Sequence, residues 1–284
     1  MAIIILVSFL VIIGLILWTI KAAPKTPLYG ELLSENLKVS EERESILFVG
    51  DSNVKGEFSG SFIQKLLENS NIQSYQVVNG GRNFETIPSL LQRLSALKHL
   101  NFDYIFILVG TFDVAVGQGG PLQLFQSLIK GQRSYTDKVQ FENEYRALIK
   151  LVKSMTKKEI VLLTLPTLGE SVDGWGQEKT IFYSNLIREI ATSEKCGLID
   201  LNKSLQKKMF GDGDVARISR DFDGGWISIE TYLRYYFLWE KVTLTRRRTG
   251  MRWTTDLLHM NKKSADFLAS MIAQYIITRR RPTN

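Results

Sequence analysis

The stretch Ile46-Leu47-Phe48-Val49-Gly50-Asp51-Ser52 joins a short apolar run to a glycine turn and two polar residues. An uninterrupted apolar run of this kind favours a strand that is buried on both faces. Such strands belong to parallel sheets, whose ligand sites lie beyond the carboxyl ends of the strands. Because Ser52 follows the run almost at once, we expect its side chain at that edge of the sheet.

Similar apolar runs recur along the chain and alternate with amphipathic helical patterns. The predicted strands cover residues 46–50, 74–78, 103–109, 159–165 and 197–201. The predicted helices cover residues 60–69, 86–98, 139–156, 178–195 and 261–279. This alternation predicts a three-layer α/β/α fold with a central, mostly parallel sheet that helices cover on both faces.

The first residues form an apolar segment that differs from the rest of the chain. Residues 2–20 carry no charge and are dominated by Ile, Leu and Val. At about 1.5 Å per residue, this run can cross a hydrocarbon core of about 30 Å. We therefore predict one transmembrane helix at residues 1–21, an uncleaved signal-anchor. The alternative is a cleaved signal peptide, because Ala22 and Ala23 could form a cleavage region.

The remaining chain is expected to form a linker and one domain. Residues 22–44 contain prolines and a run of charges and are predicted to be a linker, and residues 45–284 are predicted to be the domain. Lys21 and Lys25 favour a cytoplasmic domain, but so few charges leave the side of the membrane open.

Composition limits the classes of partner. The net charge of +7 suggests attraction to anionic lipids or polymers. No recognition helix or zinc-finger pattern is present, so no nucleic-acid partner is expected. A lone cysteine, Cys196, excludes an intrachain disulfide.

Residues 211–250 form an aromatic and basic insertion in the predicted domain. The apolar spacing at 229–237 favours an extra helix over a sugar-stacking platform or a membrane-contacting lid.

Two short motifs supply the side chains of a serine hydrolase. Ser52 follows the first strand, and Asp256-Leu257-Leu258-His259 precedes the last predicted helix. A histidine can take the proton of a serine hydroxyl, and an aspartate can orient the histidine. Ser52 could instead cap the following helix, because serine is a common N-cap residue. The pairing of both motifs favours the nucleophile interpretation, with Asp51 as a structural residue that bonds loop amides.

The order of these motifs resembles the SGNH/GDSL hydrolase family, and the resemblance covers residues 45–280. It implies a flavodoxin-like fold and a GDSL-type serine esterase or lipase-like activity. Carried over by motif, Ser52 is the nucleophile, His259 the general base and Asp256 its orienting partner. No metal or organic cofactor is implied.

In that family four sequence blocks build the active site. The first holds the serine and the last holds the aspartate and the histidine, and the two middle blocks differ in this chain. The third block, Gly-x-Asn-Asp in the family, reads Gly110-Thr111-Phe112-Asp113 here, so the asparagine donor to the oxyanion is replaced. The second block matches residues 77–86 and places Phe84 where the family has a glycine whose N–H points into the oxyanion hole. We therefore expect the backbone N–H groups of Ser52 and Phe84 to hold the oxyanion, aided by Gly81 or Asn83. Gly110 and Asp113 complete the expected oxyanion and substrate-binding residues. Asn83 is preferred over Asn53 and Arg82 as the substitute donor. Phe84 and Phe112 are expected either to form an apolar wall around an acyl group or to pack on each other.

The sequence thus predicts a membrane-anchored serine esterase that hydrolyses carboxylic esters, namely O-acyl or O-acetyl groups on a glycan or lipid. A catalytically weak or inactive binding protein with this fold is one alternative, because both oxyanion blocks are altered. An acyltransferase that uses the same triad is the other.

Overall fold

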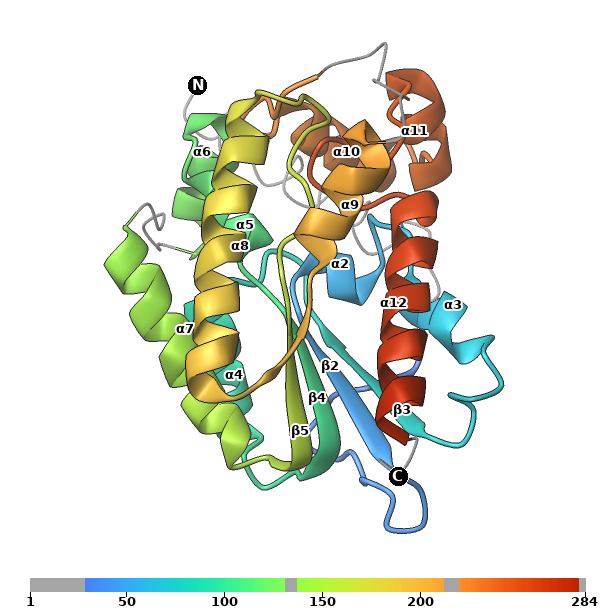
Figure 1. Ribbon diagram of the computed structural model, residues 1–284. Coiled ribbons are helices and arrows are strands. Elements are labelled where there is room, and N and C mark those ends of the chain that lie inside the picture. Colours follow the sequence, from blue (N-terminus) through green and yellow to red (C-terminus); the bar gives the residue numbers. More distant parts are fainter. Residues whose placement is uncertain (1–28, 131–136, 212–219, 281–284) are drawn as a thin grey trace, which may run out of the picture.

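The computed structural model describes residues 29–130, 137–211 and 220–280 (Figure 1). The transmembrane helix predicted at residues 1–21 lies outside these residues. Among the helices of the described ranges, none combines the length and the apolar character that a membrane crossing requires.

One parallel sheet forms the centre of the molecule. Its strands lie in the order β1-β3-β2-β4-β5-β6, and each neighbouring pair is parallel. The strands are β1 (Glu31–Leu32), β2 (Ser45–Gly50), β3 (Gln76–Gly81), β4 (Phe102–Leu108), β5 (Thr156–Leu163) and β6 (Gly197–Ile199). The predicted three-layer α/β/α class is confirmed, since helices cover both faces of this sheet (Figure 1).

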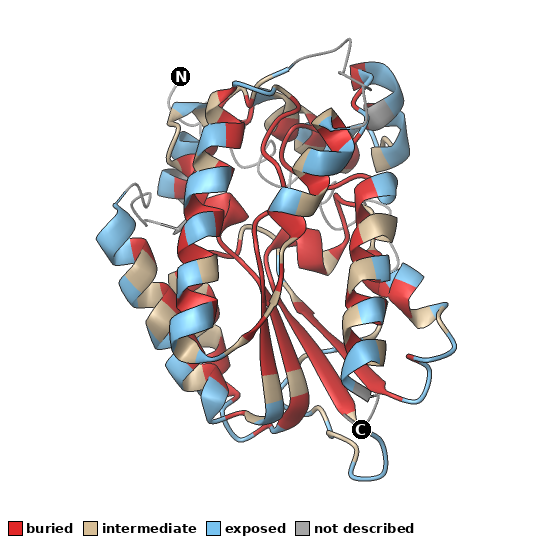
Figure 2. Cartoon of the chain, in the orientation of Figure 1, coloured by how far each residue is buried: buried red, intermediate tan, exposed pale blue. Residues whose placement is uncertain are grey.

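Two separate apolar cores lie on the two faces of the sheet. In β2, the side chains of Leu47 and Val49 enter one core and those of Ile46 and Phe48 enter the other. This alternation follows from the two-residue period of a strand and explains why every residue of β2 is buried (Figure 2). The first core is closed by α4 (Ile87–Ala96), α7 (Lys138–Lys153) and α8 (Trp175–Glu194). The second is closed by α3 (Phe62–Leu67), α9 (Leu201–Phe210) and α12 (Lys262–Arg280).

Further helices gather at the carboxyl end of the sheet, where the strands lead into their connecting loops. They are α2 (Ser52–Lys55), α5 (Thr111–Val116), α6 (Gly120–Lys130), α10 (Trp226–Phe237) and α11 (Val242–Thr249) (Figure 1). The extra helix expected in the aromatic insertion is α10, which contacts α6 from a distant part of the sequence.

Several element boundaries differ from the sequence prediction by a few residues, and three of the differences have a clear physical reason. Strand β3 continues to Gly81, because its Asn-Gly-Gly end pairs with β2 instead of turning. Strand β6 stops at Ile199, because the Asp200 side chain accepts the Lys203 N–H and caps α9. Residues 31–32 of the predicted linker form the edge strand β1, paired with β3.

Candidate active site

Ser52 occupies the first turn of α2, directly after β2. Asp51 is the N-cap of this helix, and its Oδ1 accepts the Asn53 N–H at 2.9 Å. The capping role considered for Ser52 therefore belongs to Asp51, and the Ser52 hydroxyl is left for other contacts. A Cβ at position 50 would overlap the carbonyl group of Leu108 in β4, so the close approach of the two strands requires glycine there.

The second motif forms a tight loop that folds back on itself. Thr254 and Met260 form an antiparallel bridge, and the Thr255 N–H donates to the His259 carbonyl at 2.8 Å. Inside the loop, Asp256 Oδ1 accepts the N–H groups of Leu258 and His259 at 3.2 and 2.9 Å. This local bonding explains the three-residue spacing, because it returns the His259 ring to the carboxylate of Asp256.

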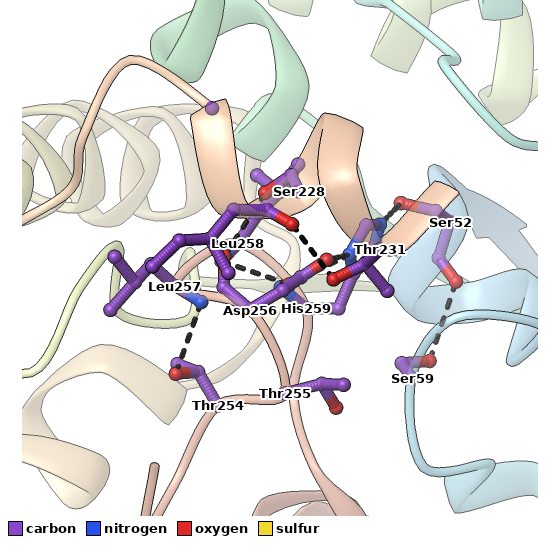
Figure 3. A network of polar contacts seen from close by, with 12 residues as sticks. Ser52, Ser59, Ser228, Thr231, Thr254, Thr255, Asp256, Leu257, Leu258 and His259 are labelled. Atoms are coloured by element: carbon purple, nitrogen blue, oxygen red, sulfur yellow. Dashed lines mark hydrogen bonds and ion pairs between the residues drawn. The ribbon is translucent and has the colours of Figure 1, made fainter. Parts of the chain in front are cut away.

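Ser52, His259 and Asp256 are hydrogen-bonded in series (Figure 3). His259 Nδ1 lies 2.8 Å from Oδ2 and 3.0 Å from Oδ1 of Asp256, and His259 Nε2 lies 2.9 Å from Ser52 Oγ. Because both carboxylate oxygens act as acceptors here, Nδ1 donates its proton and Nε2 is left to accept the serine hydroxyl. Asp256 is fully buried, and Ser52 and His259 are only 5% and 6% exposed. The geometry is that of a serine with an adjacent, oriented base.

One side-chain and one backbone hydrogen bond also join the loop to the serine helix and to the segment that follows this helix. Asn53 Oδ1, on α2, accepts the Met260 N–H at 2.9 Å, and the Gly60 N–H donates to the Met260 carbonyl at 2.8 Å. These bonds fix the distance between two motifs that lie some 200 residues apart in the sequence. Asn53, weighed as an oxyanion donor, thus has a positioning contact through its oxygen.

A buried glutamate anchors the loop from the opposite side. Glu170 is 1% exposed, and its Oε1 accepts the N–H groups of Trp253 and Thr254, each at 2.7 Å, and the Thr254 hydroxyl at 3.0 Å. Its Oε2 accepts the Arg252 N–H at 2.9 Å. Four donors therefore converge on one carboxylate, which compensates for its removal from water. The sequence analysis did not identify Glu170, because a single glutamate in a loop has no pattern.

In the second block, Phe84 adopts a backbone conformation that favours glycine. Phe84 has φ +57°, a left-handed conformation that is uncommon for a bulky residue and costs about 1–2 kcal/mol. The main chain can therefore present its N–H as a glycine would. Gly81 does not fit the role expected for it, because its N–H donates to Asn79 Oδ1 at 2.9 Å. Packing explains why position 81 is a glycine, because a Cβ there would overlap the Lys55 N–H of α2.

The other residues expected near the oxyanion have structural partners. Asn83 Nδ2 donates to Glu57 Oε2 at 2.7 Å, and Glu57 also pairs with Lys55. Gly110, with φ +113°, is the residue at which β4 turns into α5. Asp113 is fully buried, and its Oδ1 accepts the Ile87 N–H at 3.1 Å, which ties α5 to the start of α4. Asp113 thus orders the chain here by a bond between α5 and α4.

Burial also changes the protonation of two carboxyl groups behind the serine. Removal from water raises the pKa of Asp113 to about 8, even though the Ile87 N–H stabilises its charged form. Burial likewise raises the pKa of Asp51, against the opposing contribution of the Asn53 N–H. Asp113 is therefore mostly neutral in the folded protein at neutral pH.

An apolar cavity of about 80 Å³ opens beside His259. It lies between the Phe84 loop, α6 and α10, and its walls are almost entirely apolar. The lining residues are Phe58, Phe84, Leu122, Phe125, Ser228, Ile229, Tyr232, Leu233, Leu258 and His259. Phe84 also packs edge-on against Phe112, with 5.5 Å between ring centroids. Phe84 therefore lines an apolar cavity and also packs on Phe112.

Most of these cavity residues could not be found from the sequence. Phe58, Leu122 and Phe125 belong to segments with no catalytic motif, and only the folded chain brings them to His259. Within the described ranges, no three His, Cys, Asp or Glu side chains gather in a way that could hold a metal ion.

A serine, a histidine and an aspartate in this order, at the carboxyl edge of a parallel sheet, form the arrangement that serine hydrolases use. A model of the GDSL-like lipase/acylhydrolase family matches residues 48–263. The chain belongs to this family and is a hydrolase that acts on ester bonds.

Solved structures with the same fold are similar over most of the chain. The acetyl xylan esterase AlAXEase is 21% identical, with a TM-score of 0.54, and the match covers 82% of this chain and 99% of that one. A lipolytic protein of the G-D-S-L family from Veillonella parvula DSM 2008 is 13% identical, with a TM-score of 0.53 and coverage of 83% and 99%. A lipase/acylhydrolase from Enterococcus faecalis is 14% identical, with a TM-score of 0.52 and coverage of 85% and 99%. No curated protein matches the chain.

Proposed function

We propose that the protein is a serine esterase in which Ser52 is the nucleophile, His259 the general base and Asp256 the residue that orients the base. The observation that carries this proposal is the distance of 2.9 Å between His259 Nε2 and Ser52 Oγ, with Asp256 on the other ring nitrogen. An unassisted serine hydroxyl is a poor nucleophile, and this base removes its proton as it attacks.

The reaction proceeds by acyl transfer in two steps. Ser52 Oγ bonds to the carbonyl carbon of the ester while His259 takes the hydroxyl proton, and the C–O bond to the alcohol then breaks as His259 returns that proton to the leaving oxygen. Water, deprotonated by His259, attacks the acyl-serine and releases the carboxylic acid. The negative oxygen formed in each step is held by the backbone N–H groups of Ser52 and Phe84. The left-handed backbone of Phe84 supports this assignment.

The substrate is an ester of a glycan or a lipid, and the enzyme acts at a membrane to which residues 1–21 anchor it. The uncharged run at 2–20 and the net charge of +7 support this position. Three apolar side chains spaced along one side of α10 support it further. Trp226, Leu233 and Phe237 are 66%, 49% and 40% exposed.

A fluorophosphonate probe tests the nucleophile. We expect labelling of Ser52 in the full chain, no labelling of Ser52→Ala, and a loss of ester hydrolysis of at least about 10⁴-fold in that variant. Ser59→Ala is the matched control, because the Ser59 hydroxyl lies beside the serine helix and donates to main-chain carbonyl oxygens, those of Ser52 and Asn53. Folded protein that takes no label would instead support a binding protein with this fold.

Two further measurements test the reaction and the anchor. Product analysis with water alone and with added sugar acceptors separates hydrolysis from acyl transfer, since transfer yields a new ester in place of the free acid.

Alkaline carbonate extraction of membranes tests the anchor. It should leave the full chain in the pellet and release a chain that starts at residue 29. Release of both chains would contradict the anchor.

A further inference from the structure

We propose that the apolar cavity beside His259 binds the acyl chain of the ester and accommodates an acyl group of about three to four carbon atoms. This inference rests on the proposed function, because it assigns a substrate group to the same site. It predicts that propionyl and butyryl esters are better substrates than acetyl esters.

The position of the cavity points to the acyl group. The carbonyl carbon under attack must lie against Ser52 Oγ, with its oxygen towards the backbone N–H of Phe84 and its leaving oxygen near His259. Phe84 and His259 both line the cavity, and Phe58 packs on His259 with 5.8 Å between ring centroids. A substituent on the carbonyl carbon that extends between Phe84 and His259 therefore enters the cavity.

The chemistry of the walls selects a hydrocarbon chain. Three aromatic rings form one side, with Phe84, Phe125 and Tyr232 packed on one another at centroid distances of 5.2 to 6.0 Å. The Ser228 hydroxyl is already used, because it donates to the Asp256 carbonyl at 3.0 Å. Burial raises the pKa of Tyr232, so this residue is neutral. A sugar ring placed here would leave its hydroxyl groups without adequate partners, whereas each methylene group of a chain would gain about fourfold in binding.

The size of the cavity sets the length of the chain. Its volume of about 80 Å³ is roughly half of the ~150 Å³ of an apolar protein cavity that binds benzene, a molecule of six carbons. An acyl group of three to four carbon atoms therefore fills it, and an acetyl group leaves about half of it empty. One wall residue, Leu233, is 49% exposed, so the cavity opens at that end to the surface of the molecule. In an assay without membranes, a longer chain would extend into water there.

A series of p-nitrophenyl esters from acetyl to octanoyl, assayed with the full chain, tests the proposal. We expect kcat/KM to rise roughly tenfold from acetyl to butyryl and to stop rising beyond butyryl. A parallel series of alkyl acetates, in which only the alcohol lengthens, should show no such rise. An acetyl optimum would overturn the proposal, and a rise along the alcohol series alone would also overturn it, because the cavity would then hold the alcohol.

Two variants change the cavity in opposite directions. Phe125→Ala removes a wall on α6, and we expect kcat/KM to keep rising to hexanoyl or octanoyl. Ile229→Trp fills the space, and we expect the ratio of butyryl to acetyl kcat/KM to fall by about tenfold. Leu124→Ala is the matched control, because Leu124 is the neighbour of Phe125 on α6 but is 62% exposed. Unchanged ratios in both cavity variants would overturn the proposal.

Probe labelling separates the two possible failures. Loss of fluorophosphonate labelling in Ser52→Ala, together with a flat acyl series in the unaltered chain, would leave the esterase mechanism standing and remove the acyl pocket. Labelling at another residue, or none, would remove the mechanism itself.

Discussion

The loop that carries Asp256 and His259 and the wall formed by α6 and α10 face the same serine, but different interactions hold them. The loop is fixed by directional hydrogen bonds to Glu170, Asn53 and Asp256 itself. The wall consists of aromatic and aliphatic contacts such as Phe84 on Phe125 and Phe125 on Tyr232. Hydrogen bonds fix atoms to within tenths of an ångström, whereas apolar packing mainly fixes volume. The loop should therefore tolerate almost no change of polar group, and the wall should tolerate changes of size.

Two buried carboxyl groups near the site differ in the number of hydrogen-bond donors that they receive. Glu170 receives four donors and supports the loop. Asp113 lies on the side of α5, accepts the Ile87 N–H, and has its pKa raised to about 8 by burial. At Asp113 this backbone donor does not offset the loss of water, so the carboxyl takes up a proton.

The largest effect is expected when the loop loses its carboxylate. Asp256→Asn keeps an oxygen for the N–H groups of Leu258 and His259 but no longer fixes the histidine with Nδ1 as the donor. We expect kcat to fall by about 10⁴-fold with little change in folding. Steady-state kinetics measure this, with Asp266→Asn on the surface of α12 as the control. A loss below tenfold would contradict the role of Asp256.

The anchor of the loop should give the next largest effect. Glu170→Gln replaces an acceptor oxygen by an NH₂ group that faces backbone donors, and each charge-assisted bond is worth about 1.5–3 kcal/mol. We expect the free energy of unfolding to fall by about 3 kcal/mol and kcat to fall by about 10- to 100-fold. Urea unfolding and kinetics measure the two, with the exposed Glu178→Gln as the control. Full activity in a destabilised variant would mean that Glu170 supports the fold and not the geometry of His259.

Asp113 gives a smaller effect, which depends on pH. Its carboxyl is protonated in the folded state up to about pH 8 but ionises in the unfolded chain above about pH 4. The folded state therefore holds an extra proton between these values, and this group lowers the free energy of unfolding as pH rises through that window, by at most about 1.4 kcal/mol per pH unit. Asp113→Asn should remove that contribution. Urea unfolding of both proteins at pH 5 and pH 7 tests this, and parallel pH profiles would contradict it.

The smallest effect is expected at Asn83. Its amide nitrogen donates to Glu57, so the Asn83→Ala variant should lose less than tenfold in kcat. Removal of a true oxyanion donor typically costs about 10²–10³-fold. A loss in that range would support Asn83 as an oxyanion donor, as the sequence suggested. The wall side of the site would then also depend on a hydrogen bond.

Much of the fold was predictable because its signals are local. The strand at 46–50 differs from β2 by one residue, since a continuous apolar run that ends at a glycine strongly favours a buried strand. The ends of β3 and β6 were mispredicted where tertiary pairing or a cap outweighed the local pattern. In the site, Asp256 and His259 bond within one loop, as their spacing predicted, whereas no sequence pattern indicated that the Gly81 N–H donates to Asn79 Oδ1.

By itself, the sequence determined the α/β/α class and the three polar side chains at the carboxyl edge of the sheet, because strand periodicity and a three-residue motif act over short distances. Only the tertiary structure decided that Glu170 holds the loop, that Phe84 adopts a backbone conformation that favours glycine, and that α6 and α10 enclose a small apolar cavity. These features depend on contacts between segments that are far apart in the chain. Their positions follow from the packing of the whole domain and leave no pattern in any one stretch.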